Sequence, residues 1–143
     1  MMQFGLIGSG FVAQKRADAL AQDRRGKLVA VSSHTVLETT AFAEKYGVEA
    51  VYPWQELVCH PAVDVVMVCH VNRDHGVAAA AALAAGKHVV VEYPLAFQTK
   101  EAQAILALAK THDRLLHVEH IDLLGGVHRA LKEHLATVGE PQY

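Results

Sequence analysis

The sequence predicts an α/β protein: a doubly wound parallel sheet with helices on both faces. Six short apolar runs alternate with segments of helical spacing, and the runs are nearly continuous in valine, isoleucine and leucine, as in strands buried on both sides. The expected strands are 3–8, 27–33, a short one near 50–52, 64–71, 88–93 and 115–121. The expected helices are 11–22, 36–47, 54–60, 74–86 and 99–112, with Gly47 and Gly86 ending two of them.

The composition is that of a globular protein, with 52% hydrophobic and 20% charged residues among 143 and a net charge of −2. This balance predicts no binding to nucleic acid or to an anionic membrane. The two cysteines, Cys59 and Cys69, form no Cys-x-x-Cys pair, and the ten histidines are scattered, so no metal site is expected. Because the cysteines suggest no disulfide framework, a reducing cytoplasm is the expected setting. The start carries no charged leader and the alanine-rich apolar run is interrupted, so neither a secretion signal nor a membrane span is expected.

A glycine-rich turn follows the first strand and opens the first helix. It reads Gly8-Ser9-Gly10-Phe11-Val12-Ala13, a G-x-G-x-x-A pattern. Gly8 permits a tight turn, Gly10 lets a pyrophosphate approach the backbone, and Ala13 lets the helix pack closely on the strand. The unpaired N–H groups of the helix N-terminus suit phosphate. We therefore expect all six residues to form a Rossmann-type dinucleotide site, the alternative being a purely structural turn.

The end of the second strand bears on the choice of cofactor. Domains that bind NAD usually carry an acid there for the ribose 2′-hydroxyl, but this strand ends in Ser32, Ser33 and His34, with no acid before Glu38. Hydroxyl groups donate to a 2′-phosphate that a carboxylate would repel. NADPH is expected in preference to NADH, unless the serines only cap a turn.

Polar residues near the ends of later strands are further candidates. Glu92 and Tyr93 end the fifth strand, where ligands of α/β sheets bind, and Tyr93–Pro94 is expected to be a cis peptide. His75 opens a helix beside the expected cleft, either as a catalytic group or bonded to backbone. Glu119 and Asp122 follow the last strand, either holding a substrate or facing solvent.

The stretch NRDHGVAAAAALAAGKHVVVEYPLAFQTKEA resembles the Gfo/Idh/MocA family of oxidoreductases. The matching features are an Asn-x-x-His pair at Asn72 and His75 and the run from Ala85 to Val89. The family also shows a Glu-Lys-Pro strand end, where this sequence has Glu92-Tyr93-Pro94. The resemblance implies a dinucleotide-binding domain in which Asn72 and Glu92 contact the cofactor. Glu92 is also expected to be a catalytic residue. Tyr93 stands where the family usually carries a catalytic lysine. We therefore expect Tyr93 to be a catalytic residue whose role differs from that of the lysine.

Glu-Tyr-Pro, together with LLHVEHIDLLGGVH, is similar to the biliverdin reductases of that family, above all the cyanobacterial type. This implies hydride transfer from NADPH to the central methine carbon of a linear tetrapyrrole, with no substrate hydroxyl to deprotonate. A flat ligand suits a tyrosine ring. The alternatives are a dehydrogenase of a sugar or other small substrate, and a non-catalytic dinucleotide-binding module.

The family resemblance also implies a second α/β domain, covering the substrate, that this chain lacks. We expect residues 1–121 to form the Rossmann domain and residues 122–143 to form a helix and the start of the missing domain. The tail repeats apolar residues at helical spacing, which predicts contact with a further domain or self-association into a homo-oligomer. These residues are Leu124, Val127, Leu131, Leu135 and Val138.

Overall fold

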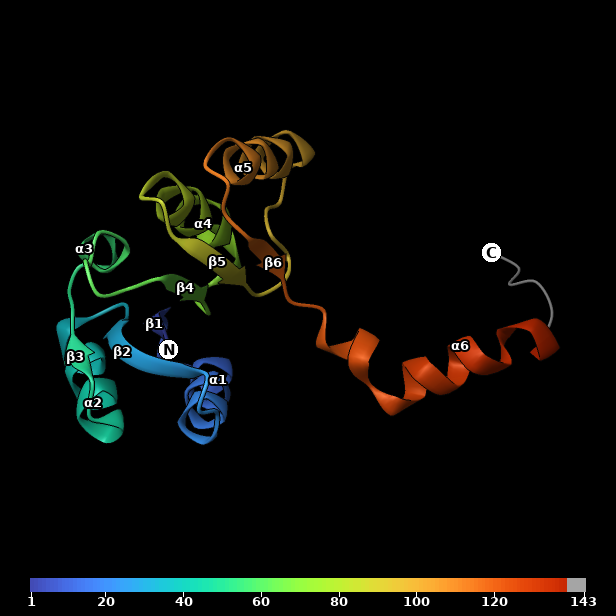
Figure 1. Cartoon of the computed structure of the whole chain (residues 1–143), viewed down its shortest axis with the longest axis horizontal. Helices are drawn as coiled ribbons and strands as arrows, with labels where there is room; N and C mark the ends of the chain where they lie inside the picture. Colours follow the sequence, from blue (N-terminus) through green and yellow to red (C-terminus); the bar gives the residue numbers. More distant parts are fainter. Residues whose placement is uncertain (139–143) are drawn as a thin grey trace.

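The computed structural model describes residues 1–138, and Figure 1 shows a twisted sheet flanked by helices, with one further helix projecting from it. The sheet has six parallel strands in the order β3-β2-β1-β4-β5-β6. This is the predicted doubly wound α/β fold. The strands are β1 (Met2–Ile7), β2 (Gly26–Ser32), β3 (Glu49–Ala50), β4 (Val65–Val68), β5 (His88–Val91) and β6 (Leu116–Val118).

Helices fill the connections between the strands, as predicted. The α-helices are α1 (Phe11–Gln22), α2 (Val36–Tyr46), α3 (Trp54–Val58), α4 (His75–Ala84), α5 (Thr99–Thr111) and α6 (Gly126–Val138). Two short 3₁₀ helices, η1 (Asn72–Asp74) and η2 (Ile121–Leu124), precede α4 and α6. Gly47 and Gly86 follow α2 and α4 with φ of 64° and 75°, the left-handed conformation that glycine adopts most easily.

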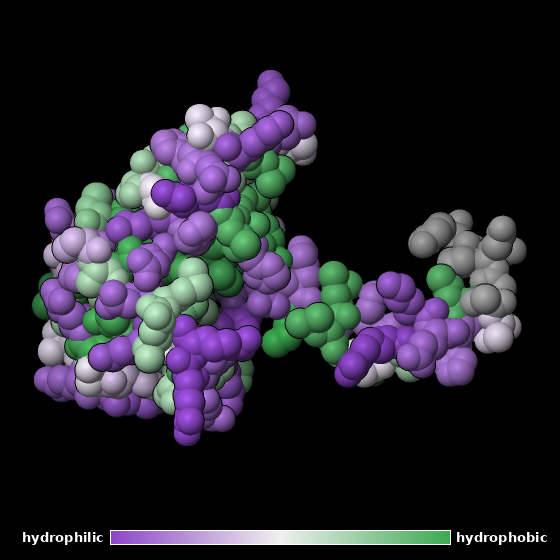
Figure 2. Space-filling view, viewed as in Figure 1, coloured by the Kyte–Doolittle hydropathy of each residue, from purple (hydrophilic) through white to green (hydrophobic). Residues whose placement is uncertain are grey.

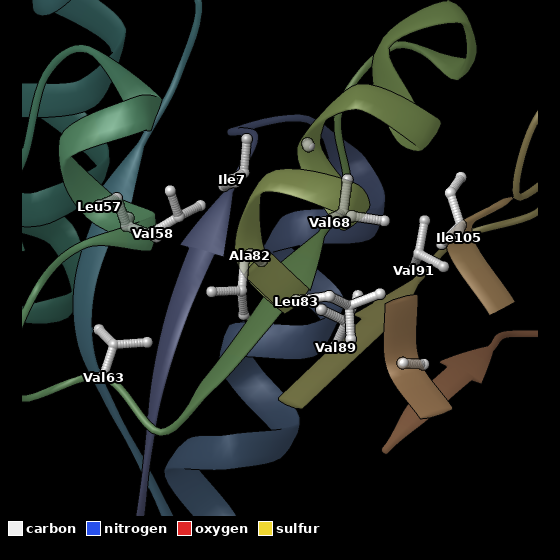
Figure 3. Close-up of a cluster of buried hydrophobic side chains, with 14 of the residues drawn as sticks. Ile7, Leu57, Val58, Val63, Val68, Ala82, Leu83, Val89, Val91 and Ile105 are labelled. Atoms are coloured by element: carbon white, nitrogen blue, oxygen red, sulfur yellow. The ribbon is translucent and has the colours of Figure 1, made fainter. Parts of the chain in front are cut away.

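The two faces of the sheet have separate cores. Helices α1 and α2 cover one face, where Ala13 and Ala17 pack with Leu6 and Phe42. Helices α3, α4 and α5 cover the other, where Ile7 and Val68 belong to one buried cluster with Leu83. Figure 3 shows Ile105 of α5 beside Val91 of β5 in the same cluster. Neighbouring residues of one strand thus enter opposite cores, which is why the strands read as continuous apolar runs.

All carboxyl ends of the strands meet at one edge of the sheet because every pairing is parallel. The strand order reverses between β1 and β4, since β1 leads by way of α1 to β2 on one side, while β4 lies on its other side. Ligands of open α/β sheets bind at such a reversal. The candidate residues after β1, β2, β4, β5 and β6 are therefore brought to one edge.

The last strand is shorter than predicted. An extended segment was expected over 115–121, but β6 ends at Val118 and η2 begins at Ile121. As an edge strand, β6 has only β5 as a partner, and the ladder stops after Glu119 N–H donates to the Val91 carbonyl. His120 consequently lies outside the strand.

Helix α6 extends away from the sheet and its covering helices in Figure 1. Leu124, Val127, Leu131 and Leu135 are 73%, 84%, 60% and 44% exposed, and Figure 2 shows apolar surface between the sheet and α6. The expected apolar stripe is thus uncovered as far as Leu135. The side chain of Val138 and residues 139–143 lie outside the described part of the chain.

The core predicts where truncation of a leucine is costly. Leu83 of α4 is fully buried, whereas Leu106 of α5 is 55% exposed. Leu83→Ala is expected to lower the free energy of unfolding by about 2–5 kcal/mol, because it leaves a cavity. The matched control Leu106→Ala is expected to change it by about 0.5 kcal/mol or less. Urea unfolding of both variants measures the difference, and equal losses would contradict the assignment of the core.

Candidate functional site

The turn after β1 is held by a close approach to β4. Gly8 has φ of 122°, its N–H donates to the Ser32 carbonyl at 2.7 Å, and a Cβ there would clash with the Cys69 carbonyl oxygen. A side chain at this position is therefore excluded both by conformation and by space. The fold of the chain therefore requires glycine at position 8, whether or not a ligand binds.

Gly10 differs from Gly8 because nothing in the chain requires it. Its φ is −72°, and a Cβ there would have no neighbour within 4 Å. Gly10 is the N-cap of α1, and no side chain caps the first N–H groups of this helix. A glycine with room to spare, at a bare helix N-terminus, fits the close approach of a ligand phosphate.

Two adjoining hollows lie at this edge, with volumes of about 310 Å³ and 260 Å³, and Cys69 and His70 border both. The first is lined by Gly8, Ser9, Gly10, Ser33, His34, Glu38, Cys69, His70 and Val71. The second is lined by Val12, Cys69, His70, Asn72, His75, Glu92 and Tyr93. Most of the residues predicted from separate strand ends are thus brought together, and the loop after β4 separates the two hollows.

The two serines at the end of β2 have different positions. Ser33 Oγ lies 2.6 Å from Ser9 Oγ and 3.4 Å from a Glu38 oxygen, at the border of the first hollow. Ser32 is fully buried, and its Oγ has no hydrogen-bond partner within the described residues. Ser32 does not line the first hollow, because alternation along the strand turns its side chain away, so its contact with a cofactor stays a prediction.

Two imidazole rings form the wall beside the serines. The rings of His34 and His70 are 4.2 Å apart and inclined at 62°. Burial, together with the nearby His34, lowers the pKa of His70 from its ordinary value, so His70 is neutral near pH 7. His34 is exposed at the border of the first hollow, and its contact with the cofactor stays a prediction.

His75 is held by backbone on both sides. It is 1% exposed, with Nδ1 2.9 Å from the Pro94 carbonyl oxygen and Nε2 3.0 Å from the His70 carbonyl oxygen. This matches the alternative in which a histidine at the start of a helix bonds to backbone. His75 borders the second hollow and ties the segment after β4 to the segment after β5, which leaves its catalytic role a prediction.

Arg16 joins two carboxylates at the strand ends, and the sequence reasoning missed it. Its Nε and Nη2 donate to Glu92 Oε1 at 3.0 and 2.8 Å, and Nη2 lies 3.1 Å from Glu119 Oε2. Burial alone would lower the pKa of Arg16, but the bonds and charges of Glu92 and Glu119 outweigh it and raise that pKa. One signal was present in the sequence, since Arg16 follows Val12 by one helical turn and so shares a face of α1 with the loop.

Cys69 lies beside this ion pair at the border of both hollows. Burial, reinforced by the charges of Glu92 and Glu119, raises the pKa of the Cys69 thiol to about 12. The thiol is therefore uncharged near neutral pH and contributes an apolar wall rather than a nucleophile.

Tyr93 is half-exposed at the second hollow. Its ring stacks on that of His120, with centroids 5.8 Å apart and an angle of 15° between the planes. The expected cis peptide at Tyr93–Pro94 is confirmed, and a second one occurs at Tyr52–Pro53. The two rings together present a flat surface beside Glu92.

The remaining predicted residues are more peripheral. Glu119 is 9% exposed and bonded to Arg16, so it is not the solvated residue of the alternative reading. Asp122 is exposed on η2, and Phe11 is 75% exposed, with Lys15 Nζ 5.4 Å above its ring. Ala13 is fully buried and packs α1 on the sheet, as predicted.

Neither a cluster of potential metal ligands nor a candidate membrane span occurs within the described residues, 1–138. Nowhere in that range do three or more histidine, cysteine, aspartate or glutamate side chains gather closely enough to hold a metal ion. No helix in the same part of the chain is long and apolar enough to cross a membrane.

The comparisons with known proteins agree with this geometry. Residues 2–120 match the oxidoreductase family with an NAD-binding Rossmann fold (Gfo/Idh/MocA), and the chain belongs to that family. It is 31% identical to 1,5-anhydro-D-fructose reductase of Ensifer adhaerens over 99% of this chain and 43% of that protein. It is 42% identical to mouse biliverdin reductase A over 52% of this chain and 25% of that protein.

Among solved structures, the chain is similar to biliverdin reductase from Synechocystis sp. PCC 6803, crystallised with biliverdin and NADP⁺. The TM-score is 0.92 and the identity 43%, over 97% of this chain and 44% of that one. The chain therefore spans less than half the length of these relatives. It is the NAD(P)-binding Rossmann domain of a Gfo/Idh/MocA oxidoreductase.

The phosphate loop yields a direct prediction. Gly10→Ala is expected to weaken binding of NADP⁺ by about tenfold or more, because the new methyl group occupies space that the pyrophosphate needs. Its thermal stability should stay within a few degrees of the wild type, since no protein atom lies near that methyl group. The control Gly126→Ala adds a methyl group with equal space in α6 and should leave binding unchanged. Tight binding by Gly10→Ala would contradict the assignment.

Proposed function

We propose that this chain is the cofactor half of a biliverdin reductase-like enzyme that uses NADPH to reduce biliverdin to bilirubin. A hydride from NADPH bonds to the central methine carbon of the tetrapyrrole, and a proton from solvent or from the rest of the protein goes to a pyrrole nitrogen. NADP⁺ and bilirubin are the products. The relative from Synechocystis supports the proposal, since it is similar along almost the whole chain.

The observation that carries the proposal is Tyr93 at the position of the family lysine. Among the described residues that line the second hollow there is no amine, whereas the half-exposed Tyr93 ring lies there and stacks on the ring of His120. Oxidation of an alcohol needs a group that accepts the hydroxyl proton, whereas hydride addition to a methine carbon does not. A planar conjugated ligand also gains from stacking on an aromatic ring.

The loop and its surroundings fit the cofactor. Gly8, Ser9, Gly10 and the first N–H groups of α1 would hold the pyrophosphate, with the adenosine ribose at Ser33 and His34. The nicotinamide would lie in the second hollow, against Val12, Asn72 and Glu92. The bound cofactor supplies the hydride, and the chain orients it and excludes water from one face.

The substrate assignment predicts that cofactor binding and biliverdin reduction need different parts of the protein. Residues 1–143 are expected to bind NADPH but to reduce biliverdin poorly, because the other wall of the substrate site comes from a further domain. A chain extended through the downstream reading frame should reduce biliverdin with NADPH. In that longer chain, Tyr93→Ala should lower kcat/KM for biliverdin about tenfold or more while keeping NADPH affinity.

A spectrophotometric assay with NADPH and biliverdin measures both effects, and Leu106→Ala is a control at an exposed side chain of α5. Full turnover by residues 1–143 would contradict the need for a further domain. Activity of the extended chain on 1,5-anhydro-D-fructose, but not on biliverdin, would favour the sugar reductase instead.

The preference for NADPH over NADH is a separate proposal. It rests on the lack of an acid at the end of β2 and on NADP⁺ in the similar crystal structure. Among the residues that line the first hollow, Glu38 is the one carboxylate. Its negative charge repels a 2′-phosphate and so opposes the preference for NADPH in part.

We expect NADPH to bind more tightly than NADH, and Ser33→Asp to shift the ratio of the two affinities toward NADH by about tenfold, because a second carboxylate repels the 2′-phosphate. Thr111→Asp adds the same charge at the far end of α5 and should leave the ratio unchanged. Fluorescence titration with each cofactor measures the ratios. Equal affinities in the wild type would contradict the preference.

A further inference from the structure

The charges of Arg16, Glu92 and Glu119, which meet at the ends of β5 and β6, do not sum to zero. Arg16 contributes one positive charge, and Glu92 and Glu119 contribute two negative charges, so the cluster of these three residues carries a net charge of −1. Their side chains are only 22%, 16% and 11% exposed, so solvent screens this charge less than it screens charges at the surface.

The surrounding groups do not cancel that charge. The Cys69 thiol is uncharged near neutral pH, because burial raises its pKa to about 12, and His70 is neutral because burial lowers its pKa. His117 Nε2 lies 3.7 Å from Glu119 Oε2, but its side chain is 55% exposed and faces solvent.

Arg16 also fixes where the charge lies. It makes two hydrogen bonds to Glu92 Oε1 and a third contact to Glu119 Oε2, which ties α1 to the ends of two strands. Glu92 borders the second hollow. Val12, which lies one helical turn before Arg16, borders it too. The net negative charge is thus held beside the position proposed for the nicotinamide.

We propose that Arg16 is a positioning residue that holds Glu92 and Glu119 as a unit with one net negative charge, and that this unit makes the site bind oxidised cofactor more tightly than reduced cofactor. The physical reason is that the nicotinamide ring is cationic when oxidised and neutral when reduced, so a fixed charge acts on the difference between the two. This inference rests on the proposed placement of the nicotinamide, but not on biliverdin as the substrate. In an enzyme that donates hydride, such a charge favours the transfer by stabilising the cationic product.

The test is the ratio of NADP⁺ to NADPH affinity, measured by separate titrations at about pH 8, where carboxyl groups are ordinarily ionised. The wild type should bind NADP⁺ about three- to tenfold more tightly than NADPH. Glu119→Gln brings the net charge to zero and should lower that ratio about three- to tenfold, while Arg16→Met brings it to −2 and should raise it by a similar factor.

Three further variants separate charge from structure. Arg16→Lys keeps the charge and loses the two-pronged contact, so it should keep the ratio near the wild-type value while weakening both affinities together. Glu44→Gln removes a charge from the exposed surface of α2 and should change nothing. If Arg16→Met fails to fold, the Glu119→Gln ratio still decides, because that variant retains the bond between Arg16 and Glu92.

The outcomes distinguish this inference from the proposed function. Movement of the ratio in opposite directions for Glu119→Gln and Arg16→Met would support it, even in a protein that does not reduce biliverdin. A ratio that is unchanged in Glu119→Gln, or that moves in the same direction in both variants, would overturn it while leaving the cofactor site in place. If the wild type binds neither form, the placement of the cofactor is wrong and this inference falls with it.

Discussion

The close approach of β1 to β4 at the reversal of the strand order determines the rest of this site. Gly8 turns the chain directly against the Cys69 carbonyl, which leaves no room for a side chain. Because the turn is this tight, α1 starts at once after the sheet and its N-terminus opens onto the carboxyl edge. The same contact places Cys69 and His70 between the two hollows, so one packing constraint divides the edge into two compartments.

The second compartment depends on ties between segments that are distant in the chain. His75 joins the backbone after β4 to the backbone after β5, and Arg16 joins α1 to the ends of β5 and β6. Buried carboxylates are costly unless they are paired, so Glu92 and Glu119 at the strand ends require a cation such as Arg16. Tyr93 is left half-exposed beside these paired groups, where a flat ligand can reach it.

Much of the fold could be predicted from the sequence, because it depends on local patterns. Apolar runs, glycines after helices and the glycine-rich loop fixed the elements, and Gly47 and Gly86 lie where the sequence placed them. The sequence predicts a cofactor contact for both Ser32 and Ser33, but only Ser33 borders the first hollow, because the position of the hollow depends on how the sheet and its loops pack. The role of Arg16 was missed for a similar reason, since its partners are 76 and 103 residues away and only the packing of α1 on the sheet brings them together.

The central claim is that the carboxyl edge of the sheet binds a dinucleotide across both compartments. A third hollow of about 380 Å³ offers an internal comparison, because it lies at the opposite edge, beside Met1, Lys27 and Val48. The most direct measurement is the change in backbone amide NMR shifts on adding NADP⁺ to residues 1–143. The account predicts saturable shifts at Gly8, Gly10, Asn72 and Tyr93, with none at Lys27 and Val48. Shifts confined to the opposite edge, or to the first compartment alone, would contradict it.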